Sequence, residues 1–244
     1  MPEVSEQLPR AILWDLDGTL LDSHDHWSAT WSEMADRRGV TWTEAHGMAL
    51  VGMDLLDAGH YIRDQLGFQD SAAELVKEMV TGVEQLLWTS VPWQPGAREL
   101  LAEVRAACVP SALVTMSYRS LVEPVLAQLP SDTFDVVVTG DEVSHGKPHP
   151  APYLAAAAAL GVDPRDCVAI EDSKTGVASA TAAGCAVVVV AAGRLVEAAE
   201  RRVVVAGLEA LGLDAIRELV STVPVVGDGT RVRGDAPLYS LDGR

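Results

Sequence analysis

Two carboxylates near the start of the chain, Asp15 and Asp17, stand one residue apart after an apolar run over residues 12–14. A β-strand places residues i and i+2 on the same side, so both side chains can face one small volume. Two like charges about 4 Å apart repel by roughly 4 kcal/mol at an effective dielectric constant of 20. Gly18 follows the pair and lets the chain bend. The pattern predicts a buried strand that delivers two acids to a site for a cation; an ordinary pair of surface acids in a loop is the alternative.

The remainder of the chain after residue 95 alternates helix-like and strand-like segments. The patterns predict helices over 97–107, 119–129, 151–160, 174–183, 195–200 and 208–219, and strands over 111–115, 134–139, 167–170, 186–190 and 202–205. Strands that alternate with helices imply a parallel sheet covered on both faces. With the strand over 12–14 added, we expect an α/β core with a Rossmann-like parallel sheet of about six strands, built from residues 1–21 and 93–221.

One long segment, residues 22–92, interrupts this alternation. Its apolar residues follow helical spacing, as in Trp27, Trp31 and Met34 and again in Leu75, Met79 and later positions. We therefore expect an α-helical cap domain over 22–92, inserted into the core. Residues 222–244 are rich in Gly, Pro, Asp and Arg without a convincing period, and this pattern predicts an extended or loosely ordered tail.

Composition narrows the class of protein and its partners. Hydrophobic residues make up 48% of the 244-residue chain, and no run approaches the roughly 18 apolar residues of a membrane-spanning helix. The polar, acidic first residues differ from a signal peptide, so a cytoplasmic protein is expected. A net charge of −17 opposes binding to nucleic acids and to anionic membranes. Three cysteines without paired spacing, Cys108, Cys167 and Cys185, are expected to be small buried residues rather than a disulfide or zinc site.

Polar residues fall where the predicted strands end. Ligands of open parallel sheets bind beyond the carboxyl ends of the strands, so these residues are the candidates for a functional site. A lysine pinned between a glycine and a proline is notable because the chain contains only three lysines. Beside the first acidic pair, the strand ends and the loops after them supply Thr115, Met116, Ser117, Lys147, Glu171, Asp172 and Ser173.

In their order and placement, these residues resemble the four motifs of the haloacid dehalogenase superfamily of phosphohydrolases and phosphomutases. The motifs read Asp15-Leu16-Asp17-Gly18-Thr19, then Thr115, then Lys147, then Glu171-Asp172-Ser173. Each one alone is a weak signal, whereas the ordered set is highly specific. The helical insertion resembles the branch with an α-helical cap, which contains β-phosphoglucomutase and phosphatases of phosphoglycolate and small sugar phosphates.

The resemblance implies a Mg²⁺-dependent phosphatase that hydrolyses a small phosphorylated metabolite, such as a sugar phosphate, through an aspartyl-phosphate intermediate. It makes Asp15 the nucleophile and Asp17 the general acid and base, with Thr115 and Lys147 also in the catalytic set. The residues expected to bind phosphate or substrate are Thr115, Met116, Lys147 and His24. The expected metal ligands are Asp15, the backbone carbonyl of Asp17 and Asp172, with Glu171 close by or reaching the ion through water.

Two alternatives stay open at this stage. A phosphomutase of the β-phosphoglucomutase type is the first, but the arginine that grips the second phosphate in that enzyme aligns with Leu55, three residues after Gly52, which favours a phosphatase. The residue after Thr115 is often Asn in relatives and is Met116 here, so the local chemistry can differ. A catalytically idle binding or regulatory protein is the second alternative. Neither the substrate nor the choice between monomer and homodimer follows from the sequence.

Overall fold

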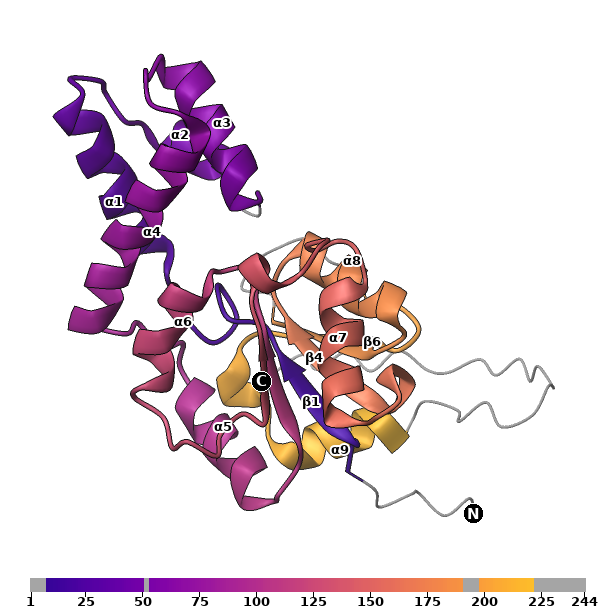
Figure 1. Ribbon diagram of the computed structural model, residues 1–244. Helices are drawn as coiled ribbons and strands as arrows, with labels where there is room; N and C mark the ends of the chain where they lie inside the picture. Colours follow the sequence, from indigo (N-terminus) through magenta and orange to yellow (C-terminus); the bar gives the residue numbers. More distant parts are fainter. Residues whose placement is uncertain (1–7, 51–52, 191–197, 222–244) are drawn as a thin grey trace, which may run out of the picture.

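A computed structural model describes residues 8–50, 53–190 and 198–221 of the chain. Its six strands form one sheet in the order β3-β2-β1-β4-β5-β6, and every neighbouring pair is parallel. The strands are β1 (Ala11–Trp14), β2 (Ser111–Val114), β3 (Val136–Val138), β4 (Cys167–Glu171), β5 (Ala186–Val190) and β6 (Arg202–Val205). Figure 1 shows β1 and β4 in the middle of the core, with helices on both sides. The predicted α/β core is confirmed.

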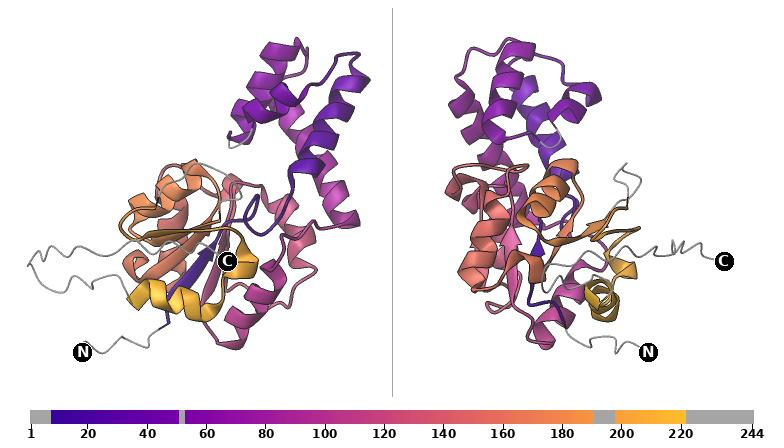
Figure 2. Two further views of the ribbon diagram at one scale, coloured as in Figure 1. Left: turned by 180° about the vertical axis from the view of Figure 1, so that it is seen from behind. Right: turned by 90° about the vertical axis from the view of Figure 1, so that its right-hand side faces the viewer.

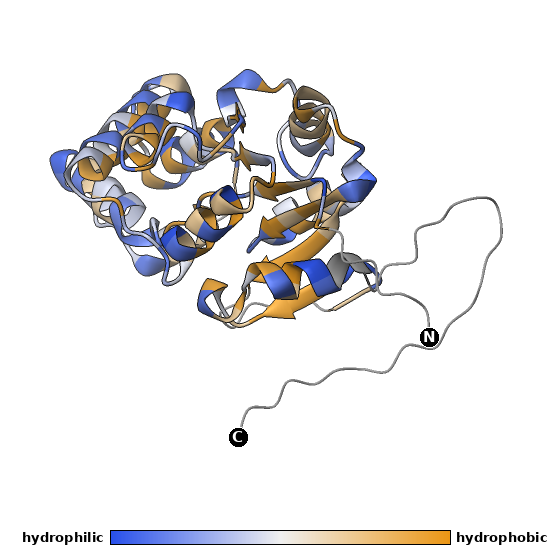
Figure 3. Cartoon of the chain, turned by 90° about the horizontal axis from the view of Figure 1, so that it is seen from below, coloured by the Kyte–Doolittle hydropathy of each residue, from blue (hydrophilic) through white to orange (hydrophobic). Residues whose placement is uncertain are grey.

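Successive residues of the central strand face two different helical layers. Ile12 and Trp14 pack with helices α5 (Ala97–Ala106), α6 (Arg119–Leu126) and α9 (Leu213–Ser221). Ala11 and Leu13 pack with α7 (Ala151–Leu160) and α8 (Lys174–Ala183) on the other face. Both faces of the sheet are therefore covered, which is why the strands read as continuous apolar runs. Figure 3 shows the same division, with hydrophobic strands inside and hydrophilic residues on the outer sides of the helices.

Four helices between β1 and α5 form the inserted cap. They are α1 (His24–Arg37), α2 (Glu44–Leu50), α3 (Leu55–Leu66) and α4 (Ala72–Thr89). The longest of them, α4, begins with a capping box of Ser71 and Glu74 and packs against both α1 and α3. Figures 1 and 2 show the four helices as a group that stands above one end of the core. The inserted helical cap is confirmed; its bounds at 22 and 92 stay a prediction.

The two segments that connect cap and core lie side by side. Leu21 and Trp93 form an antiparallel bridge. On either side of it, the N–H of Asp22 donates to the carbonyl of Pro92 and the N–H of Gln94 donates to that of Leu20, both at 2.8 Å. The chain thus enters and leaves the cap at one place, and α4 additionally packs against α6 of the core.

Several predicted elements have different bounds in the structure. The helix expected over 208–219 is a 3-10 turn at Leu208–Ala210 followed by α9, because Gly212 is a poor residue for a helix interior. Half of the helix expected over 195–200, residues 195–197, lies outside the described residues; the prediction was wrong for 198–200, which are not helical, and Ala199 there pairs with Arg202 in a bridge. The predicted tail over 222–244 also lies outside the described residues.

Cys167 and Cys185 are buried, as expected. The expectation was wrong for Cys108, which is exposed with a positive φ of 55° at the turn after α5. Within the described residues, no helix has both the length and the apolar character needed to cross a membrane.

Candidate active site

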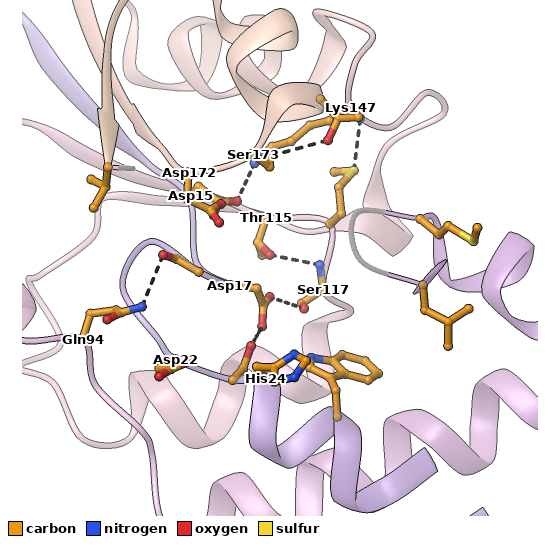
Figure 4. A pocket seen from close by; sticks show the side chains of 18 of the residues that line it. Asp15, Asp17, Asp22, His24, Gln94, Thr115, Ser117, Lys147, Asp172 and Ser173 are labelled. Carbon is orange, nitrogen blue, oxygen red and sulfur yellow. Dashed lines mark hydrogen bonds and ion pairs between the residues drawn. The ribbon is translucent and has the colours of Figure 1, made fainter. Parts of the chain in front are cut away.

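A cavity of about 770 Å³ lies between the cap and the carboxyl ends of the strands. Figure 4 shows polar side chains from both parts of the molecule around it. The core contributes residues that follow β1, β2 and β4, as the sequence predicts for a parallel sheet. Of the residues that the sequence singled out, the cavity is lined by Asp15, Asp17, His24, Thr115, Met116, Ser117, Lys147, Asp172 and Ser173, whereas Glu171 is not part of its lining.

The Lys147 ammonium is buried and bound to three oxygen atoms. Its Nζ lies 2.6 Å from Oδ1 of Asp15 and 2.6 Å from Oε1 of Glu171, and it donates to the carbonyl of Val114 at 2.9 Å. Three acceptors satisfy all three of its N–H groups. Burial acts to lower the pKa of Lys147, but the charges of Asp15 and Glu171 outweigh it and the pKa is raised. Lys147 is therefore a fixed positive charge beside Asp15.

The Glu171 carboxylate is fully buried, and both of its oxygen atoms accept hydrogen bonds. Its Oε1 accepts from the Tyr153 hydroxyl at 2.7 Å as well as from Lys147. Its Oε2 accepts from the backbone N–H groups of Asp172 and Ser173 and from the Ser173 hydroxyl, at 3.1, 3.3 and 3.1 Å. Gly176 packs so closely against this carboxylate that a Cβ there would overlap it. This pattern of contacts suits a residue that holds Lys147 in place.

Three carboxylates, those of Asp15, Glu171 and Asp172, offer oxygen atoms that lie within 4.8 Å of one another. Burial, and then the neighbouring Glu171 charge, raise the pKa of Asp15, while Lys147 opposes this rise. A donor set made only of oxygen atoms fits a hard cation such as Mg²⁺. Gly18 is part of this arrangement, because its φ is +91° and a Cβ there would overlap Oδ2 of Asp172. The turn after Asp17 must therefore be made by glycine.

The Asp17 carboxylate lies apart from this cluster. It accepts one hydrogen bond from the Ser23 hydroxyl and one from the Ser117 hydroxyl, each at 2.6 Å (Figure 4). The expectation that Asp15 and Asp17 face one volume holds in that both line the cavity. Their side chains nevertheless have different partners, because β1 ends at Trp14 and the alternation of a strand does not extend to Asp17.

The sequence did not single out Ser23 or Tyr153 for the site, and Ser117 was named at a strand end without a role. Ser117 had a usable signal, since it follows the end of β2 by three residues. Tyr153 is the one aromatic residue in the alanine-rich helix α7 and is completely buried, which is a weaker signal. Ser23 precedes α1 but makes no side-chain capping bond there, because its hydroxyl is bound to Asp17.

Thr115 and Met116 organise the loop after β2. The buried Thr115 hydroxyl accepts from the backbone N–H of Ser117 at 3.0 Å. The Met116 sulfur accepts from the backbone N–H of Lys147 at 3.2 Å, so this methionine contacts the loop that carries the lysine. In the cap, His24 at the start of α1 and Leu55 at the start of α3 face the same cavity.

Comparisons with known proteins agree with this architecture. The model of the haloacid dehalogenase-like hydrolase family matches residues 12–190. Hexitol phosphatase A of Escherichia coli (strain K12) is 34% identical over 183 residues, which cover 74% of this chain and 82% of that protein. The phosphorylated carbohydrates phosphatase of Thermotoga maritima is 30% identical over 175 residues, covering 71% of this chain and 81% of that protein.

Among solved structures, the chain is similar to a CbbY variant from Rhodobacter sphaeroides in complex with xylulose-(1,5)bisphosphate. The TM-score is 0.74 at 25% sequence identity, and the match covers 86% of this chain and 99% of that one. The fold is therefore shared over most of the chain.

Proposed function

This chain belongs to the haloacid dehalogenase-like hydrolases and is a phosphoric monoester hydrolase, and we propose that it releases phosphate from a small phosphorylated metabolite of the sugar-phosphate kind through an aspartyl-phosphate intermediate. The observation that carries the proposal is the Lys147 ammonium 2.6 Å from the Asp15 carboxylate, with Asp172 in the same cluster. A carboxylate nucleophile and a buried cation at one end of a cavity suit phosphoryl transfer.

In the first step of this proposal, a carboxylate oxygen of Asp15 attacks phosphorus and the bond from phosphorus to the leaving oxygen breaks. Asp17 gives its proton to that oxygen, so the leaving group departs as an alcohol. Lys147 stays paired with Asp15 and stabilises the charge of the transferring phosphoryl group. Glu171 accepts a hydrogen bond from the Lys147 ammonium, and the Tyr153 hydroxyl donates to Glu171. Together these two bonds fix the position of the ammonium.

In the second step, Asp17 takes a proton from water, the water oxygen bonds to phosphorus, and the bond between phosphorus and Asp15 breaks. Free phosphate leaves and both aspartates return to their starting states. Ser23 and Ser117 hold the Asp17 carboxylate at the cap side of the cavity in the structure. Ser23 belongs to the connection between core and cap, so the position of the cap and that of Asp17 are linked.

We propose Asp15, Asp172 and the backbone carbonyl of Asp17 as the residues that hold Mg²⁺, with Glu171 acting on the site through Lys147 and its contacts to Asp172. When bound there, the ion supplies positive charge that lowers the repulsion between the phosphate and the acids. The phosphomutase alternative is disfavoured because Leu55, the residue aligned with the phosphate-binding arginine of β-phosphoglucomutase, lines the cavity and carries no charge.

The deciding experiment measures phosphate release from p-nitrophenyl phosphate and from a panel of sugar phosphates, with and without Mg²⁺. We expect hydrolysis that EDTA abolishes and that Asp15→Asn reduces by at least a thousandfold. Equal rates for both proteins would mean that Asp15 is not the nucleophile. Incubation with a hexose 1-phosphate and a bisphosphate activator tests the mutase, because isomer formation faster than phosphate release contradicts the proposal.

A further inference from the structure

The cavity carries negative charge well beyond its candidate catalytic end. Asp22 in the connection to the cap, Asp54 just before α3 and Glu209 in the turn Leu208–Ala210 all line it. They come from three separate parts of the chain, and all three are exposed. Figure 4 shows Asp22 near His24, on the far side of Asp17 from Asp15.

Positive charge on the described lining is confined to Lys147, with His24 as the one other side chain there that can become a cation. Lys147 is already bound to Asp15, Glu171 and a backbone carbonyl. It can therefore serve the phosphate that reacts next to Asp15, but it does not extend to the opposite end of a substrate. On the described lining, a second anionic group would meet three carboxylates and no lysine or arginine.

We propose that the substrate is the monophosphate of a neutral, hydroxyl-rich molecule and that the cavity discriminates against a second phosphate or a carboxylate on the leaving group. This inference rests on the proposed function and deepens it, since it names the substrate class of the same site. It separates this chain from the CbbY variant whose structure holds a bisphosphate.

The physical reason lies in what carboxylates accept. Hydroxyl groups of a polyol donate to Asp22, Asp54 and Glu209, and hydrogen bonds to an ionised acceptor are the strong ones. An anionic group cannot donate and is repelled instead. Charges within one Debye length, about 8 Å at physiological salt, are only partly screened from one another. Such an anionic group also loses bound water when the substrate enters the cavity. The three carboxylates offer it no hydrogen bond that would offset the free-energy cost of this loss.

The apolar part of the lining suits the carbon skeleton of such a molecule. Trp27 and Leu55 face the cavity from α1 and α3, and Met53 lies beside them. The Trp27 side chain is half-buried, and its ring centroid lies 5.8 Å from that of Trp31. The two rings of helix α1 therefore pack together. Apolar walls with a few polar groups are the usual composition of a small-molecule site.

The test uses substrate pairs that differ in one group. Glycerol 3-phosphate is compared with 3-phosphoglycerate, and sorbitol 6-phosphate with 6-phosphogluconate, because each pair exchanges a CH₂OH group for a carboxylate. Each compound is measured as a substrate and as a competitor of p-nitrophenyl phosphate hydrolysis, so that binding is seen even without turnover. We expect the neutral member to bind or react at least tenfold better in both pairs; an equal or better acidic member overturns the inference.

A neutralised variant makes the test specific for the three carboxylates. It combines Asp22→Asn, Asp54→Asn and Glu209→Gln. The substitution at residue 54 preserves the cap of α3, where the aspartate accepts from the N–H of Leu56 at 2.8 Å, since asparagine caps helices equally well. We expect the preference for the neutral member of each pair to fall at least fivefold in this variant. An unchanged preference overturns the inference.

A control variant removes the same amount of charge from exposed positions outside the described cavity lining. It combines Asp36→Asn, Glu44→Gln and Glu99→Gln. We expect its preference to match that of the unmodified protein, and an effect equal to that of the neutralised variant would assign the preference to net charge instead. Hydrolysis of p-nitrophenyl phosphate keeps the two proposals apart, because its absence contradicts the phosphatase itself rather than the substrate class.

Discussion

Nζ of Lys147 lies 2.6 Å from Oδ1 of Asp15, and both side chains are nearly inaccessible to solvent. Lys147 comes from the loop after β3, and Asp15 follows β1. The contact therefore joins two loops that are 132 residues apart in the sequence, and it couples the candidate nucleophile to the one buried ammonium among the described residues.

Replacing this lysine should harm stability and activity together. In Lys147→Met, Asp15 and Glu171 lose their shared cation, and removing one partner of a buried ion pair costs about 3–5 kcal/mol. The same change removes the charge that stabilises the transferring phosphoryl group, worth about a factor of 10²–10³ in kcat. Urea denaturation and p-nitrophenyl phosphate kinetics measure the two effects. Lys77→Met, on the exposed side of α4, is the control, and a Lys147→Met protein with a tenth of normal activity would contradict the assigned role.

Two glycines with similar backbone conformations should respond differently to alanine. Gly18 and Gly39 both have positive φ, +91° and +67°, so either substitution costs roughly 1–2 kcal/mol of backbone strain. Only at residue 18 does the new Cβ meet a carboxylate, that of Asp172, whereas nothing lies within 4 Å of a Cβ at residue 39. We expect Gly39→Ala to lose stability alone. Gly18→Ala should also need more Mg²⁺ for half-maximal activity; the same Mg²⁺ requirement in both variants would refute this.

The Tyr153 hydroxyl should affect catalysis without touching substrate. Tyr153→Phe removes the donor to Glu171 at 2.7 Å and keeps the ring, whose centroid lies 5.2 Å from Nζ of Lys147. A lost hydrogen bond to a charged group costs about 1.5–3 kcal/mol of stability. Because Glu171 positions Lys147, we expect kcat to fall several-fold with KM nearly unchanged. Tyr61→Phe in α3 is the matched control, and a fall in stability with an unaltered kcat would show that the Tyr153 hydroxyl serves stability alone.

The three cysteines should divide into one reactive and two protected thiols. Burial, and then nearby charges or the other thiol, raise the pKa values of Cys167 and Cys185 to about 12 each. At pH 8 only about one in 10⁴ of these groups is a thiolate, the form that reacts. Cys108 is exposed. Titration with Ellman's reagent should give one fast thiol per native chain and three after unfolding, and rapid reaction of a second thiol in the native protein would disagree with the structure.

The elements of the core were predictable where their ends carry a local signal. Helices over 151–160 and 174–183 have the expected bounds because Gly161 and Gly184 take the left-handed conformation that ends them. The valines of 186–190 form a strand buried on both faces, as such a run predicts. The prediction of a single helix over 208–219 was wrong. The apolar residues there follow one helical spacing, but the structure has a 3-10 turn, then Gly212, and then a separate helix.

The sequence could indicate which residues come together at the candidate site, because the loops that follow parallel strands lie along one edge of the sheet. The internal contacts of the site were not predictable. The bond from Tyr153 to Glu171 depends on how α7 packs on the sheet, and the two serines at Asp17 come from a cap connection and a core loop. No spacing within the chain encodes such contacts, since each depends on distances between elements that only the packed structure defines.

The pairing of Leu21 with Trp93 has a consequence for how such a protein can change over evolution. Since the chain leaves the core and returns to it at neighbouring points, the cap can gain, lose or exchange residues without shifting β1 against β2. Insertions attached in this way are the ones that folded domains tolerate. The residues that we propose to select the substrate, in the cap and along the cavity lining, can then diversify while the candidate catalytic residues at the strand ends stay unchanged. A cap from a relative, joined at these two positions, is the natural unit of exchange.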